Sequence, residues 1–225
     1  MVRAVLFDVD FTLALPGPEL GPEGYRKLGE RHGLTLDPSR YEAARQAAIA
    51  SLQRHPELEH DDELWIAFTE RIVRGMGGDA DSAYGCATEL VAVWEQHDKF
   101  TLYEDVLPVL EELRGHGLKL GLISNGSRDL DEFVRHHALE VDCAIGSRAF
   151  GRTKPHPDIF RRALTLLEVE ARETAMVGDS YEDDIEGARA LGMQAFLLDR
   201  DGRHPHEPGR LETLLALPAA LGLAK

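Results

Sequence analysis

The sequence predicts an α/β fold, in which a parallel sheet carries helices on both faces and an all-helical block interrupts the chain early. Three observations support this prediction. Residues 2–7 are almost entirely apolar and are typical of a buried strand. Residues 15–99 show helical patterns and no convincing strand. From residue 100 onward, strand and helix patterns alternate, which is typical of a parallel sheet.

The helical block begins where the segment LALPGPELGP, residues 13–22, interrupts the strand pattern with Pro and Gly. Beyond it, apolar residues recur at helical spacing in four short segments separated by short turns. Such a pattern indicates a small helical bundle. The four helices are expected near 19–32, from 37 to 52, from 61 or 62 to 76, and over 83–94.

The second half of the chain contains the partners of the first strand. A helix over 106–115 precedes a regular alternation, with strands expected at 118–125, 142–147, 174–180 and 194–199 and helices between them, the last over 183–192. Because residues 2–7 can pair only with these strands, we predict one α/β domain from 1–14 and 100–225, with 15–99 inserted in it. Right-handed crossovers place the carboxyl ends of all parallel strands at one edge, where ligands bind in such sheets.

Composition narrows the classes of partner. The 225 residues include 25 Lys and Arg against 40 Asp and Glu, a net charge of −15. This surface repels phosphate backbones and anionic lipid, so we expect no nucleic-acid and no membrane partner. The two cysteines, Cys86 and Cys143, are too few for a disulfide framework or a zinc ribbon. With neither a membrane-span pattern nor a signal-peptide pattern, the expected location is the cytoplasm.

Polar clusters follow three of the predicted strands at the ligand-binding edge. Two carboxylates within a few ångströms of each other repel by roughly 4 kcal/mol at an effective dielectric of about 20, so something must offset this repulsion, and a divalent cation can. Oxygen-rich clusters suit Mg²⁺, and a lysine and backbone N–H groups can hold a phosphoryl group beside it. The residues concerned are Asp8 and Asp10, Ser124, Asn125 and Gly126, Lys154, and Asp179 with Asp183 and Asp184.

Asp8 and Asp10 also suit covalent catalysis. A carboxylate can attack phosphorus to form an aspartyl-phosphate, and a second acid can protonate the leaving oxygen. Together with the cation site, this predicts transfer of a phosphoryl group.

Four motifs resemble, in order and spacing, the signatures of the haloacid dehalogenase-like hydrolase superfamily. They are VLFDVDFTL, ISNGS, KPHPDIF and GDSYEDDIEGARALGM. The resemblance covers essentially the whole chain. It implies a Rossmann-like core and identifies the helical insert, 15–99, with the small cap domain of one subclass. It also implies Mg²⁺ as the cofactor and a small phosphorylated metabolite as the substrate.

Site residues follow from the resemblance position by position. Asp8 matches the nucleophile and a metal ligand, and Asp10 matches the general acid/base, which binds metal through its backbone carbonyl. Ser124 matches the phosphate-binding hydroxyl, with Asn125 beside it. Lys154 matches the lysine that balances the negative charge.

The last acids of the family pattern lie in the fourth motif. Asp179 matches the second metal carboxylate, and the final acid is either Asp184, which the register favours, or Asp183. Dehalogenases of the superfamily lack an acid two residues after the nucleophile, so Asp10 points to phosphate esters. The resemblance therefore implies a Mg²⁺-dependent phosphomonoesterase.

Phe11 departs from the family pattern, which has Gly at this position. Because a phenylalanine disfavours a positive φ, the backbone there either has an ordinary negative φ or is strained, and we expect the first. The side chain then either packs beneath the insert or forms an apolar wall of the substrate site. Arginines of the insert could recognise an anionic substrate or could be a solvated face, and the sequence leaves this open. They are Arg45, Arg54, Arg71 and Arg74.

Three alternative functions are weighed. A sugar phosphomutase of the same superfamily also needs an acid such as Asp10. A response-regulator receiver module uses acids, a hydroxyl and a lysine on a parallel sheet, but it is roughly 120 residues long and carries no helical insert. A catalytically silent binding protein would be expected to have lost a catalytic residue, whereas every predicted position here is filled. The oligomeric state is left open.

Overall fold

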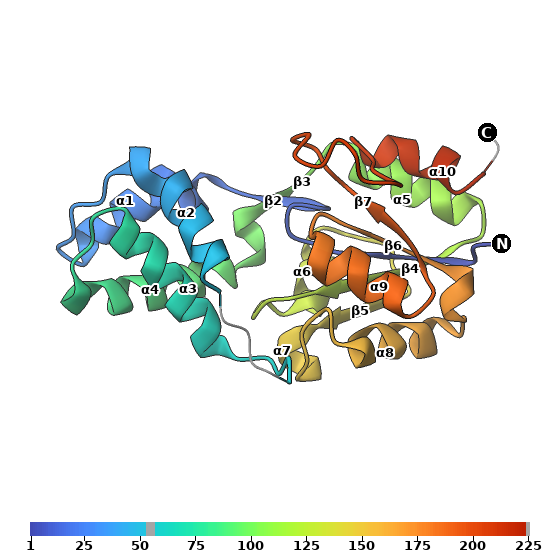
Figure 1. Cartoon of the computed structure of the whole chain (residues 1–225), viewed down its shortest axis with the longest axis horizontal. Coiled ribbons are helices and arrows are strands. Elements are labelled where there is room, and N and C mark those ends of the chain that lie inside the picture. The colour runs from blue at the N-terminus through green and yellow to red at the C-terminus, as the bar shows by residue number, and fades with distance from the viewer. Residues whose placement is uncertain (53–56, 224–225) are drawn as a thin grey trace. The chain divides into compact units, whose positions relative to one another are not determined.

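The computed structural model describes residues 1–52 and 57–223 (Figure 1). The chain forms two compact units. The α/β unit comprises Met1–Leu15, Leu102–Asn125 and Asp129–Lys225, and the helical unit comprises Pro16–Thr101 together with Gly126–Arg128. The expected insert, 15–99, thus differs by one or two residues at its ends, and three residues after β4 join the helical unit. Arg54 lies outside the described residues.

A five-stranded parallel sheet forms the centre of the α/β unit, which confirms the predicted fold class. The strand order is β5-β4-β1-β6-β7, so β1 lies in the middle and pairs with both β4 and β6. All four residues of β1 are buried, as expected for an apolar strand with neighbours on both sides and helices on both faces. The strands are β1 (Ala4–Phe7), β4 (Lys119–Ser124), β5 (Cys143–Gly146), β6 (Thr174–Gly178) and β7 (Gln194–Leu197).

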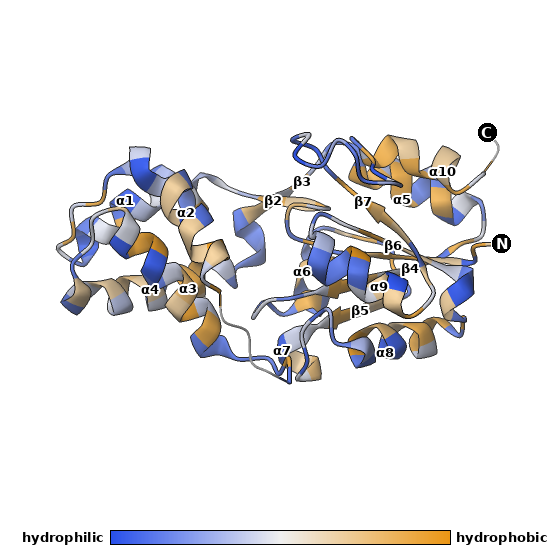
Figure 2. Cartoon of the chain, viewed as in Figure 1, coloured by the Kyte–Doolittle hydropathy of each residue, from blue (hydrophilic) through white to orange (hydrophobic). Residues whose placement is uncertain are grey.

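Helices cover both faces of this sheet (Figure 1). Ala4 and Leu6 of β1 pack in one apolar cluster with residues of α8 and α9, among them Phe160 and Ala188. Figure 1 shows α5 and α10 on the other side of the sheet, and Figure 2 shows much of both helices as apolar. The helices of this unit are α5 (Val106–Gly115), α6 (Leu130–His136), α7 (Ser147–Phe150), α8 (Pro157–Leu167), α9 (Gly187–Ala190) and α10 (Leu217–Ala220).

Two local expectations were wrong. The segment 183–192 is not one α-helix, because a π-helical turn at Tyr181–Glu186 precedes α9. A π-turn is wider than an α-turn and is frequent at functional sites. A second, two-stranded sheet also escaped prediction: β2 (Ala14–Pro16) pairs with β3 (Phe100–Leu102). Strands of three residues are too short to show a period of two, and Pro16 weakened the signal further.

The helical unit contains the four expected helices. Its core joins residues of all four, including Leu28, Ala44, Ile72 and Leu90. Asp side chains cap two of the helices by accepting hydrogen bonds from backbone N–H groups. Asp61 accepts from Glu63 N at 2.9 Å at the start of α3, and Asp79 accepts from Asp81 N at 3.0 Å at the start of α4. The helices are α1 (Pro22–Arg31), α2 (Tyr41–Ala50), α3 (Asp62–Gly75) and α4 (Ala80–Trp94). Across the described part of the chain, we find no helix with the length and apolar character needed to cross a membrane.

Candidate active site

The candidate site begins at the carboxyl end of the central strand. Asp8 follows β1 directly, its side chain is buried, and its N–H donates to Val177 O of β6 at 2.9 Å. Parallel strands end at a common edge, so the residues after β1, β4 and β6 meet there. Asp8 therefore stands where the neighbouring strands also deliver polar side chains.

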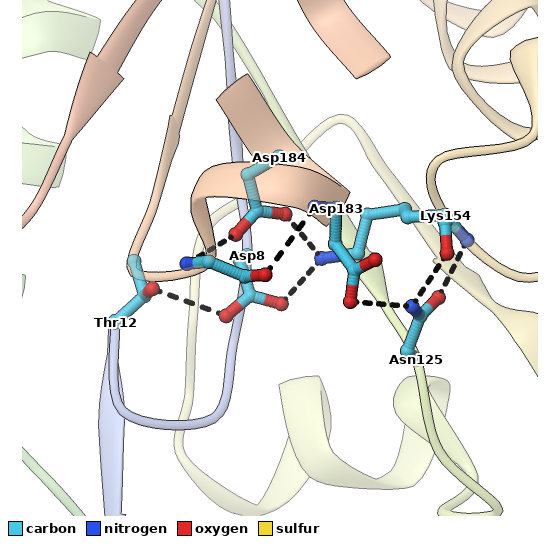
Figure 3. A network of polar contacts seen from close by, with 7 residues as sticks. Asp8, Thr12, Asn125, Lys154, Asp183 and Asp184 are labelled. Atoms are coloured by element: carbon cyan, nitrogen blue, oxygen red, sulfur yellow. Dashed lines mark hydrogen bonds and ion pairs between the residues drawn. The ribbon is translucent and has the colours of Figure 1, made fainter. Parts of the chain in front are cut away.

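Lys154 forms the centre of the site (Figure 3). Its side chain is 2% exposed, and Nζ donates to Asp8 Oδ1 at 2.5 Å and to Asp184 Oδ1 at 2.7 Å. Burial disfavours the ammonium charge, but the carboxylates of Asp184 and Asp8 outweigh burial and raise the pKa of Lys154. Lys154 thus stays protonated and serves as a fixed positive charge rather than as a base.

Three carboxylates gather beside this lysine. Oxygen atoms of Asp8, Asp179 and Asp184 all lie within 4.8 Å of one another. Burial, with the charges of Asp8 and Asp184, raises the pKa of Asp179 well above its usual value. Burial is also the main reason why the pKa of Asp184 rises to about 7. Ionising all three acids would leave two negative charges that the one lysine does not compensate, and a divalent cation with a preference for oxygen ligands fits that deficit.

Of the two candidate acids of the fourth motif, Asp184 joins the cluster. Its side chain is fully buried, and its Oδ2 accepts from Ser180 N at 3.1 Å. A Cβ on Gly178 would lie 2.1 Å from Asp184 Oδ2, so only glycine at the end of β6 leaves room for this carboxylate. Asp183 instead accepts from Asn125 Nδ2 at 3.4 Å and is not among the three clustered carboxylates.

Asn125 holds the backbone of Lys154. Its Oδ1 accepts from Lys154 N at 2.7 Å, and its Nδ2 donates to Lys154 O at 3.0 Å (Figure 3). A primary amide matches both polar groups of one residue, so the end of β4 fixes the loop that carries the lysine. Ser124 is the last residue of β4 and is buried, and Gly126 belongs to the helical unit.

The turn that follows Asp8 contradicts one expectation. Phe11 has φ +63°, in the left-handed region, although a normal backbone was expected there. Hydrogen bonds within the turn contribute to this conformation: Phe11 N donates to Ala14 O at 2.7 Å, and Leu13 N donates to Val9 O at 2.8 Å. Asp10 is half-buried, and its backbone forms an isolated β-bridge with Ala14 in the same turn. A phenylalanine therefore occupies a conformation that glycine adopts at no steric cost.

Thr12 belongs to the site and was not predicted. Its hydroxyl donates to Asp8 Oδ2 at 3.1 Å, so Lys154 holds one oxygen of the carboxylate and Thr12 the other. A hydroxyl four residues after the first acid was the available signal. It was overlooked because a threonine in a turn has many ordinary roles.

Arginines of the helical unit have partners within that unit. Arg71 donates to Ser51 O at 2.7 Å, and Arg74 pairs with Glu70 at 3.5 Å. Arg45 lies 3.8 Å from Glu42. Contacts of this kind are common between side chains on helix surfaces. A role of these arginines in substrate recognition stays a prediction.

The chain is similar to known proteins over most of its length. Residues 2–192 match the model of the haloacid dehalogenase-like hydrolase family. A haloacid dehalogenase-like hydrolase domain-containing protein 3 from Bos taurus is 32% identical over 92% of this chain and 85% of its own length. A glyceraldehyde 3-phosphate phosphatase from Methanopyrus kandleri is 33% identical over 92% of this chain and 88% of its own. The crystal structure of a phosphatase of this family from Thermococcus onnurineus superposes with a TM-score of 0.69 at 27% identity, over 98% of both chains.

Proposed function

The chain belongs to the haloacid dehalogenase-like hydrolase family, and from that premise we propose that it is a Mg²⁺-dependent phosphomonoesterase acting on a small phosphorylated metabolite. One observation carries the proposal. Both oxygens of the Asp8 carboxylate are held, one by Lys154 and the other by Thr12, inside a cluster of three acids. An oriented carboxylate beside a fixed cation suits attack on phosphorus.

The reaction proceeds in two steps. Asp8 attacks the phosphorus atom with one carboxylate oxygen, and the bond from phosphorus to the leaving oxygen breaks as Asp10 protonates that oxygen. Water then attacks the phosphorus of the aspartyl-phosphate, Asp10 takes the proton, and the bond to Asp8 breaks to release inorganic phosphate. Lys154 stabilises the negative charge on Asp8 and on the transferred group throughout.

Asp8, Asp179 and Asp184 would hold the metal ion, with Asp10 contributing its backbone carbonyl as the family pattern implies. Bound there, Mg²⁺ would neutralise the excess carboxylate charge and polarise a phosphoryl oxygen. Ser124, with the backbone N–H groups near Asn125 and Gly126, is the proposed phosphate-binding element. The role of the helical unit as a cap, like the phosphate-binding role, stays a prediction.

The reacting group is a phosphate ester rather than a carbon–halogen bond. Only an ester has a leaving oxygen that needs the proton of an acid such as Asp10. Two similar proteins are named phosphatases, and one of these names specifies a three-carbon sugar phosphate. We therefore place the substrate among small phosphorylated metabolites.

Phosphate release from a panel of phosphorylated metabolites, with Mg²⁺ and with a chelator, tests the function. We expect turnover only with the metal and none after Asp8→Asn. Asp184→Asn should lose far more activity than Asp183→Asn, because Asp184 pairs with Lys154 and belongs to the group of three carboxylates, whereas Asp183 does not belong to that group. Release without a bisphosphate requirement separates a phosphatase from a phosphomutase. No hydrolysis of any substrate by the unaltered chain would favour the silent binding protein.

A further inference from the structure

Arg200 lies at the same sheet edge as the candidate site. It follows β7 by three residues, and the carboxyl end of β7 shares the edge at which β1, β4 and β6 end. One of its terminal nitrogens, Nη2, donates to Thr12 O at 3.1 Å, across 188 positions of sequence. Arg200 thus contacts the backbone of the residue whose hydroxyl holds Asp8.

The guanidinium has little freedom to move. Nη1 and Nη2 each donate to one oxygen of Asp105, at 2.8 and 2.9 Å, in the two-pronged arrangement that fixes the plane of an arginine. The same plane lies over the ring of Tyr103, with Cζ 3.9 Å from the ring centre. Asp105 is itself fixed, since Oδ2 also accepts from Thr213 Oγ1 at 2.7 Å and from Leu214 N at 2.9 Å.

The backbone that Arg200 contacts needs external support. Residues 9–14, which we call the 9–14 turn, include Phe11 with its positive φ, a conformation that is unfavourable for a residue other than glycine. Such a conformation persists only where surrounding contacts impose it. Two of these contacts come from distant segments: Arg200 holds the carbonyl of Thr12, and Tyr103 N donates to Leu13 O at 3.0 Å.

We propose that Arg200 is a positioning residue for the nucleophile, which it orients through the carbonyl of Thr12. Asp105 and Tyr103 fix the guanidinium, the guanidinium fixes the 9–14 turn, and Thr12 in that turn holds Asp8 Oδ2. Arg200 touches neither substrate nor metal ligand in this role. The catalytic consequence rests on the proposed phosphatase function, whereas the effect on the turn does not.

Arg210 provides a matched control for Arg200. It too pairs with a buried aspartate, since Nε donates to Asp199 Oδ2 at 2.7 Å, and the two arginine side chains are 20% and 19% exposed. Only Arg200 donates to the 9–14 turn. Arg200→Ala and Arg210→Ala should therefore lower thermal stability to a similar extent but differ in their effect on that turn.

The first measurement is amide hydrogen exchange of peptides covering 9–14. In this turn the N–H groups of Phe11, Leu13 and Ala14 are hydrogen-bonded within the turn. Arg200→Ala should accelerate their exchange by about 10-fold or more, and Arg210→Ala should leave it unchanged. Equal exchange in the two variants would overturn the proposal whether or not the protein is a phosphatase.

The second measurement is the kinetics of phosphate release, well below the unfolding temperature of both variants. Arg200→Ala should lower kcat about 10- to 100-fold, as expected for a misplaced nucleophile, with KM changed by less than about threefold. Arg210→Ala should keep the kcat of the unaltered chain. Faster exchange in Arg200→Ala with unchanged kcat would overturn the catalytic part of the proposal. If the unaltered chain releases no phosphate, the proposed function fails, and hydrogen exchange alone decides the role of Arg200.

Discussion

Phe11 shows how one residue can hold unfavourable backbone geometry beside candidate catalytic acids. Phe11→Gly should remove roughly 1–2 kcal/mol of strain and add about 0.5–1 kcal/mol of chain entropy to the unfolded state. The two terms nearly cancel, so we expect a melting temperature within about 4 °C of the unaltered chain. If the Phe11 ring forms an apolar wall of the substrate site, the variant should hydrolyse a wider range of phosphate esters. Thermal unfolding and a substrate panel check both expectations.

Ala138→Gly is the matched control for the backbone term. Ala138 also has a positive φ, +50°, but it follows α6 and carries only a methyl group. The control should show the same small net change in stability from these two backbone terms, with unaltered kinetics. If Phe11→Gly instead loses stability while its substrate range stays the same, the ring serves packing and the wall interpretation is wrong.

Spacing along the chain predicted some site residues better than others. Asp8, Asp10, Lys154 and Asp179 stand at strand ends or in family register, so position alone identified them as candidates. Register favoured Asp184 over Asp183 but left both open, because the choice depends on the space left by Gly178. The contacts of Asn125 and Arg200 join segments 29 and 188 residues apart, and no local pattern records such pairs.

Secondary-structure elements also differ in how far local sequence predicts them. The sheet was predictable because each of its long strands is a continuous apolar run between helical patterns. The pair β2 and β3 was not, because three residues cannot show a period and each strand gains its stability from the other. The π-turn at Tyr181–Glu186 was also beyond prediction, since tertiary contacts of Asp184 override the helical preference of the segment.

The loop after β7 depends on the charge of one aspartate. Asp199 accepts from Arg203 N and His204 N, each at 2.8 Å, and from Arg210 Nε at 2.7 Å. Burial disfavours its carboxylate, but these hydrogen bonds outweigh burial and lower the pKa of Asp199 to about 2, from an ordinary value of 3.8. Because the folded pKa is the lower one, the stabilisation is fully present above pH 3.8 and is lost as the pH falls through about 2.

Asp199→Asn should therefore destabilise the protein in a pH-dependent manner. We expect a loss of about 1–3 kcal/mol near pH 6, the cost of depriving a charged donor of its acceptor. The difference from the unaltered chain should shrink between pH 4 and pH 2, where the unaltered aspartate also becomes neutral. Urea unfolding of both proteins at pH 6, 4, 3 and 2 measures this difference in the free energy of unfolding. A difference that stays constant down to pH 2 would contradict the role given to the Asp199 charge.

At the scale of the whole molecule, two kinds of negative charge act on stability. The chain carries a net charge of −15, so any added salt relieves general repulsion by screening. The acids of the site behave differently, because Asp8 and Asp184 are buried, Asp179 is half-buried, and the three carboxylates gather around one lysine. A cation that binds there stabilises only the folded state, since the unfolded chain does not assemble Asp8, Asp179 and Asp184.

Mg²⁺ should therefore raise the melting temperature more than sodium chloride of equal ionic strength. At about 100 times the dissociation constant the gain is about 2.7 kcal/mol, or roughly 5–10 °C for a chain of this size. Asp184→Asn removes one ligand and one of the two excess negative charges, so its response to Mg²⁺ should approach its response to sodium chloride. Both the unaltered chain and Asp184→Asn are treated with chelator, and their melting temperatures are then measured in each salt to distinguish cation binding from screening. Equal effects of the two salts on the unaltered chain would mean that screening alone acts and that the acids hold no cation.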